Sequence, residues 1–136
     1  MTDCIFCAIV AGNAPAERLF EDESTLAFLD ANPATDGHTL VIPKRHAGDL
    51  FEIEDEDADA LWRSVRRVAR GIREALAPDG MNLFQSNGRA AFQSVFHVHV
   101  HVVPRWADDG IRLPWIPRPG DPQGMAEVAE RLRAAL

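Results

Sequence analysis

The sequence predicts an α+β fold, with an antiparallel sheet of about five strands, a long central helix and a C-terminal helix. Two observations carry this prediction. Short β-branched or apolar runs follow one another with brief polar turns between them, as antiparallel strands do. Residues 56–76 instead repeat their apolar positions every three or four residues, which is typical of an amphipathic helix. The length of 136 residues suffices for one apolar core, so we expect a single domain over residues 1–136.

Five short segments predict the strands. Each is rich in apolar or β-branched residues and is bounded by turn-forming residues or by proline. The first two are joined by the polar sequence Asp22-Glu23-Ser24, which favours a hairpin. In chain order the predicted strands are residues 18–21, 25–29, 38–42, 81–85 and 95–103.

Three segments predict helices. Residues 4–10 offer apolar side chains for burial, and Gly12 ends this first segment. The long helix over residues 56–76 carries acidic residues in its first turns and arginines later. This polarity matches the helix dipole, so we expect the arginines to form a solvated face and not a binding patch. Asp121 and Pro122 predict the N-cap and first turn of the amphipathic C-terminal helix.

The composition restricts the partners of the protein. Lys and Arg number 14 against 21 Asp and Glu, and a formal net charge of −7 argues against binding to nucleic acid polymers. No secretory signal and no apolar run of membrane-span length is visible, so we expect a cytoplasmic protein without membrane contact. In such a reducing compartment the two cysteines are expected to be thiols or metal ligands, with a disulfide as the remaining alternative.

Three of the five histidines, His97, His99 and His101, alternate with valine in the last predicted strand. Alternate side chains of a strand share a face at intervals of about 6.6 Å, so the imidazoles are expected to form a row. Imidazole changes charge near neutral pH and serves as nucleophile, acid, base or metal ligand. Two alternatives are a solvated strand that carries histidines by chance and a three-histidine metal site.

The pattern His-x-His-x-His over residues 97–103 resembles the signature of the histidine-triad (HIT) family, and four further blocks resemble its Hint-type bacterial branch. The resemblance spans about residues 3–105, whereas residues 106–136 form a C-terminal extension. It implies a HIT-like fold and a homodimer with the long helix as contact, although the apolar stripe of that helix could equally cover its own sheet. The further blocks are residues 3–7, 28–30, 37–46 and 93–96.

In HIT proteins the middle histidine attacks the α-phosphorus of a nucleoside 5′-phosphate derivative, a role that falls here on His99. The resemblance therefore implies a nucleoside phosphoramidase or nucleotidyl hydrolase that forms a nucleotidyl-histidine intermediate without a catalytic cofactor. It implies three catalytic partners: His38 in the hydrogen-bond network behind the nucleophile, His101 at the phosphate, and Ser94 beside the leaving group.

The same resemblance implies the substrate contacts. Asp30 would accept hydrogen bonds from both ribose hydroxyls, since an ionised carboxylate only accepts. It could also serve to shape the loop that follows it. Ser86 is an alternative to Asn87 as a phosphate contact, because the loop is short. The implied phosphate contacts are Asn87, Gln93, Ser94 and His101, and the implied walls around the base are Ile5, Phe6 and Phe28.

Cys4 and Cys7 have metal-ligand spacing, but one such pair supplies half a site. The resemblance implies that His46 and His97 complete a structural zinc site, which would pin the N-terminal helix to the sheet and leave His99 free. Two free buried thiols are the alternative to zinc, besides the disulfide.

Other functions stay open at this point. The triad also suits a hydrolase of dinucleoside polyphosphates, the second substrate class of the family. A nucleotide-binding sensor with idle catalytic residues is a further possibility. A purely structural zinc module is a third, but it leaves Asp30, Gln93 and Ser94 without a purpose.

Overall fold

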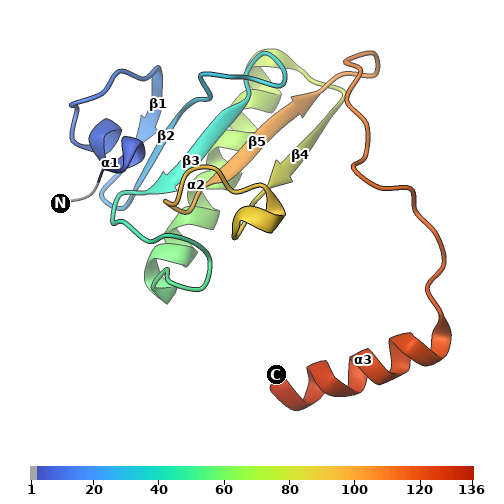
Figure 1. Cartoon of the computed structure of the whole chain (residues 1–136). Helices are drawn as coiled ribbons and strands as arrows, with labels where there is room; N and C mark the ends of the chain where they lie inside the picture. Colours follow the sequence, from blue (N-terminus) through green and yellow to red (C-terminus); the bar gives the residue numbers. More distant parts are fainter. Residues whose placement is uncertain (1–2) are drawn as a thin grey trace.

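The computed structural model describes residues 3–136, and its five strands form one antiparallel sheet in the order β1-β2-β3-β5-β4 (Figure 1). This confirms the predicted α+β fold. The elements are α1 (Ile5–Val10), β1 (Arg18–Glu21), β2 (Thr25–Leu29), β3 (Thr39–Pro43), α2 (Asp55–Leu76), β4 (Gly80–Phe84), the 3-10 helix η1 (Arg89–Ala91), β5 (Val100–Arg105) and α3 (Pro122–Ala135).

The two faces of the sheet carry different helices. On β3, Val41 points toward α2, whereas Leu40 and Ile42 point toward α1, because successive side chains of a strand alternate. The α2 face is closed by Leu61, Val65, Val68 and Ile72 against Ala27, Val41, Val100 and Val102. His101 pairs with Leu40 across the sheet and therefore lies on the α1 face, opposite α2.

Ile42 belongs to the core on the α1 face of the sheet and is fully buried. We expect Ile42→Ala to lower the free energy of unfolding by about 2–5 kcal/mol, because it deletes buried methyl groups and leaves a cavity. Urea unfolding measures the change. Leu113→Ala is the matched control, since Leu113 is 64% exposed and its truncation should cost about 0.5 kcal/mol or less. Equal midpoints for the two variants would contradict the described core.

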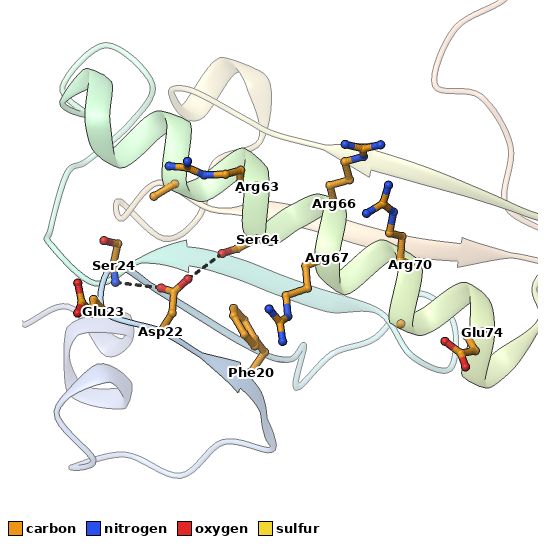
Figure 2. A pocket seen from close by; sticks show the side chains of 12 residues that line it. Phe20, Asp22, Glu23, Ser24, Arg63, Ser64, Arg66, Arg67, Arg70 and Glu74 are labelled. Carbon is orange, nitrogen blue, oxygen red and sulfur yellow. Dashed lines mark hydrogen bonds between the residues drawn. The ribbon is translucent and has the colours of Figure 1, made fainter.

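The turn between β1 and β2 is tied to α2 through Asp22 (Figure 2). Asp22 Oδ1 accepts hydrogen bonds from the backbone amides of Ser24 (2.9 Å) and Thr25 (2.7 Å). The Thr25 and Ser64 hydroxyls lie 2.6 Å apart and join the strand to the helix. The predicted hairpin is thus confirmed, and Asp22 is what holds its turn. The arginines of α2 are exposed, as predicted: Arg63, Arg66, Arg67, Arg70 and Arg73.

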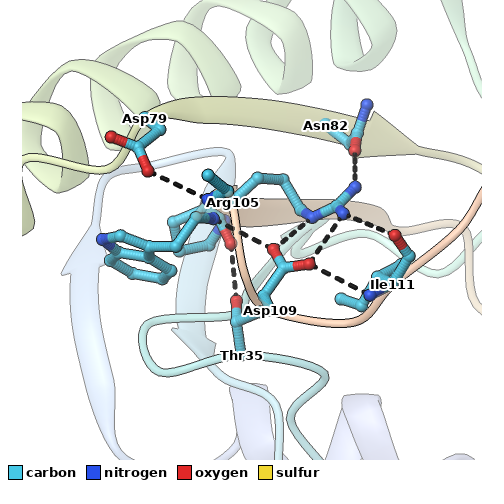
Figure 3. Close-up of polar contacts among 9 residues, drawn as sticks. Thr35, Asp79, Asn82, Arg105, Asp109 and Ile111 are labelled. Carbon is cyan, nitrogen blue, oxygen red and sulfur yellow. Dashed lines mark hydrogen bonds and ion pairs between the residues drawn. The ribbon is translucent and has the colours of Figure 1, made fainter.

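Arg105 anchors the chain where it leaves the sheet (Figure 3). Its guanidinium donates two hydrogen bonds to Asp109, of 2.6 and 2.8 Å, and others to the side chain of Asn82 and the carbonyl of Ile111. Beyond this clamp the chain runs to α3, which lies apart from the sheet and buries none of its residues (Figure 1). Asp121 caps α3, as predicted, by accepting a hydrogen bond from the amide of Gly124.

The prediction of a strand over residues 95–103 is wrong for its first half, because β5 begins at Val100. The amide of Val98 donates to the carbonyl of Ala47 (2.8 Å), in the loop after β3, and so does not join a strand ladder. Of the three triad histidines, two therefore precede the strand. Pro104 lies inside β5, beyond the last residue paired with β3, where one neighbouring strand remains.

The other predicted elements agree with the structure to within a residue at each predicted boundary. Within residues 3–136, no helix combines the length and apolar character needed to span a membrane.

Candidate active site

His99 is held in one tautomer. Its Nδ1 lies 2.7 Å from the carbonyl oxygen of His97, so Nδ1 carries the proton and donates it, which leaves the lone pair on Nε2. Within residues 3–136 no buried side-chain nitrogen or oxygen lacks a partner, and Nε2 of His99 makes no hydrogen bond there, so Nε2 reaches solvent. Burial lowers the pKa of His99, which keeps the ring neutral near pH 7. A neutral imidazole with an accessible lone pair is a nucleophile.

A second chain of contacts orients His101. The backbone amide of Ala34 donates to His38 Nδ1 (2.9 Å), so the proton of neutral His38 lies on Nε2. His38 Nε2 then donates to His101 Nδ1, 2.9 Å away. Nε2 of His101 is left as a donor, with its ring 4.9 Å from that of His99. Burial, with smaller contributions from His99 and His38, lowers the pKa of His101 to about 4.

Asp30 joins this cluster from the end of β2. Its Oδ2 lies 3.4 Å from His38 Nε2 and 3.8 Å from His101 Nδ1. Its Oδ1 accepts a hydrogen bond from the amide of Asn32 (2.8 Å), so Asp30 also shapes the loop that follows it. Of the two roles predicted for this carboxylate, the bond to Asn32 supports turn formation, and ribose binding stays a prediction.

Two of the predicted phosphate contacts, the side-chain amides of Gln93 and Asn87, are hydrogen-bonded to other groups of the protein. The Gln93 amide is buried and bonds to backbone groups of Gly48 (2.7 Å), Gly88 (2.8 Å) and Val95 (3.0 Å). Asn87 bonds to the amide of Leu50 and to the side chain of Gln85. Both side chains tie loops together, and their contact with phosphate stays a prediction. Ser94 is exposed in the same loop.

The predicted base-pocket residues divide by burial. Phe6 and Phe28 are buried in the core on the α1 face, where their rings pack edge-on at 5.4 Å. Phe6 also packs edge-on against His99, with ring centroids 5.1 Å apart at 90°. Ile5 is 50% exposed and is free to contact a ligand. Of these three, Ile5 is therefore the side chain with apolar surface to offer.

The four predicted zinc ligands converge. The ligand atoms of Cys4, Cys7, His46 and His97 all lie within 4.8 Å of one another. His97 Nε2 donates to the carbonyl of Pro43 (2.7 Å), so its Nδ1 has the lone pair, 3.5 Å from Cys4 Sγ and 3.6 Å from Cys7 Sγ. The two cysteines are not joined by a disulfide. Two thiols and two imidazoles in this arrangement fit a tetrahedral transition-metal site.

Asp30, His38 and His101 also bring their ligand atoms within 4.8 Å of one another. This second group does not fit a metal in the tautomers just described. His38 carries its proton on Nε2, the atom that faces the group, and its Nδ1 is occupied by Ala34. The cluster is better described as a hydrogen-bond relay behind His101.

Sequence reasoning missed two main-chain groups. The amide of Ala34 and the carbonyl of Pro43 select the tautomers of His38 and His97. No side-chain pattern signals a main-chain contact, because any residue type provides the same atoms.

The comparisons with known proteins agree with this geometry. The family model "HIT domain" matches residues 11–108. The protein named "Protein hit" from Bacillus subtilis is 42% identical over 137 residues, covering 98% of this chain and 94% of its own. The adenosine 5′-monophosphoramidase hnt1 of Schizosaccharomyces pombe is 37% identical over 134 residues, covering 98% of both chains.

Solved structures give the same result. A HIT family protein from Bacillus subtilis has a TM-score of 0.92 and 40% identity, covering 99% of this chain and 98% of its own. A zinc-bound histidine triad family protein from Mycobacterium smegmatis has a TM-score of 0.77 and 42% identity, covering 98% of both chains. On the sequence match, the whole-chain likeness and the histidine geometry together, this chain belongs to the HIT family.

Proposed function

We propose that this protein is a nucleotide-binding hydrolase that cleaves nucleoside 5′-monophosphate derivatives, of the purine nucleoside phosphoramidate type, at the α-phosphorus. The observation that supports the proposal is the tautomer of His99. Its Nδ1–H is bonded to a carbonyl, and its Nε2 lone pair is open to solvent. The S. pombe relative named above is a monophosphoramidase, which supports the same substrate class.

The reaction follows from these atoms in two steps. The Nε2 lone pair of His99 forms a bond to phosphorus while the bond from phosphorus to the leaving nitrogen breaks. Ser94, in the exposed loop, assists protonation of the leaving amine. Nε2–H of His101 donates to a non-bridging oxygen, where charge develops. Water then attacks the phosphorus, the bond to His99 breaks, and the nucleoside monophosphate leaves. Asp30 holds the ribose hydroxyls throughout.

Two substrates separate this proposal from its alternatives. We expect adenosine 5′-phosphoramidate to be turned over with a higher kcat/KM than diadenosine tetraphosphate. The opposite preference would favour the dinucleoside polyphosphate hydrolase. Binding of AMP without turnover of either compound would favour a nucleotide-binding sensor.

The pH profile reports the charge of His99. Burial places its pKa below the ordinary value of 6.5, and protonation removes the Nε2 lone pair. We therefore expect kcat/KM to keep more than half of its plateau value at pH 6.5 and to reach half of it only at a lower pH. Initial rates at substrate concentrations well below KM measure this profile. A half-maximal value at or above pH 6.5 would contradict the neutral, buried nucleophile.

We further propose that Cys4, Cys7, His46 and His97 hold a structural zinc ion. The four donors lie within 4.8 Å of one another, and a relative of known structure is zinc-bound. A closed set of two thiolates and two imidazoles contributes to folding, not to chemistry at the phosphate.

A homodimer is the proposed assembly. In support, β4 lies at the edge of the sheet and exposes Leu83 and Phe84, each by 44%, and α3 buries none of its residues. Analytical ultracentrifugation should give twice the chain mass of 15.0 kDa at micromolar concentration. The mass of one chain under those conditions would reject the dimer.

A further inference from the structure

We propose that the Cys4–Cys7–His46–His97 cluster positions the nucleophile, so that its metal occupancy controls turnover through two contacts made by His97 and Phe6. The inference rests on the proposed function and extends it. The metal would be a divalent transition ion of the kind that thiolate and imidazole ligands prefer. His97 and Phe6 are then positioning residues, since each acts through His99.

His97 belongs both to the cysteine–histidine cluster and to the surroundings of the nucleophile His99. Its side chain is fully buried, with Nε2 bonded to the carbonyl of Pro43 and Nδ1 directed at the cysteines. Its own carbonyl accepts the 2.7 Å hydrogen bond that fixes the tautomer of His99. The ring and the carbonyl of one residue are separated by a few covalent bonds. A ring that loses its Nδ1 partners therefore frees the peptide group that orients the nucleophile.

Phe6 provides the second contact. Its ring lies edge-on to His97 at 5.9 Å and edge-on to His99 at 5.1 Å. Phe6 sits in α1, a helix of six residues with Cys4 as its N-cap and Cys7 as its third residue. So short a helix is not stable alone and depends on what holds it against the sheet. The cysteine cluster holds both ends of the segment that carries Phe6.

A purely stabilising metal site makes a different prediction. It would change the fraction of folded protein but leave the folded molecules with the same kcat and the same His99 tautomer. The test must therefore be made on folded, metal-free protein, well below its thermal midpoint. Long-range ¹H–¹⁵N correlations of the imidazole rings report which nitrogen of His99 carries the proton. Metal content is measured separately by atomic emission.

The experiment compares the wild type with Cys7→Ser and Phe6→Leu. For Cys7→Ser we expect loss of the metal, a mixture of His99 tautomers and a kcat lower by about 10- to 100-fold, with a smaller change in KM. For Phe6→Leu we expect the metal to be retained. We also expect kcat to fall and both tautomers of His99 to be populated, as in Cys7→Ser. If Phe6 were a base-pocket wall alone, KM would rise and the His99 tautomer would not change.

Ile9→Ala is the matched control. Ile9 is buried in the same helix and belongs to the core on the α1 face, so this variant should lose stability and keep the wild-type kcat and tautomer. Folded, metal-free Cys7→Ser with wild-type kcat and tautomer would overturn the inference. So would a wild type that neither contains nor takes up metal. Failure of the proposed function would give a different result, because neither the wild type nor any variant would then turn over a phosphoramidate.

Discussion

Replacing His99 with asparagine is expected to lower kcat by about three to six orders of magnitude, because the variant has no nitrogen lone pair to attack phosphorus. Hydrolysis of adenosine 5′-phosphoramidate under saturating substrate measures the loss. AMP binding, followed by calorimetry, should persist, since Asp30 and the relay through His38 and His101 are unchanged.

Asn82→Ala is a suitable control for this experiment. Asn82 lies on β4 and contacts Arg105, on the far side of β5 from β3. We expect it to keep the wild-type kcat. A His99→Asn protein that is folded, binds AMP and retains the wild-type kcat would reject nucleophilic catalysis by this residue.

Removing the metal is expected to have a large effect on stability. A ligand that binds only the folded state adds about 4 kcal/mol to the free energy of unfolding at 1,000 times its dissociation constant. Chelation of the wild type should therefore lower the thermal midpoint, and added Zn²⁺ should restore it. Differential scanning calorimetry measures both changes.

The double variant Cys4→Ser, Cys7→Ser serves as the comparison. Without thiolates it should unfold at the low midpoint whether Zn²⁺ or chelator is present. An unchanged wild-type midpoint in chelator, equal to its midpoint in excess Zn²⁺, would contradict a structural metal centre.

The sequence predicted most of the fold because local patterns determine most of its elements. The apolar stripe of α2 and the turn at Asp22 are both visible in the residue order, and both are found in the structure. Residues 95–99 were predicted wrongly because a tertiary contact decides their conformation. The bond from Val98 to Ala47 joins segments far apart in the chain, and the alternation of histidine and valine is the same with or without it.

The candidate site divides in the same way. The residue types at His38, His99 and Asp30 could be identified from the family pattern, because the chemistry needs those side chains. The tautomer of His38 could not be predicted, since the backbone amide of Ala34 that selects it is brought there by the fold. The amides of Asn87 and Gln93 show the converse: they match a phosphate-binding pattern, yet in the structure they hold loops together.

The most direct test of the account is to trap the covalent intermediate. Wild-type protein mixed with adenosine 5′-phosphoramidate and quenched in base within one turnover should carry one adenylyl group per chain, and peptide mapping should place it on His99. An adduct on His101 or on another residue in place of His99 would contradict the assignment of His99 as the nucleophile.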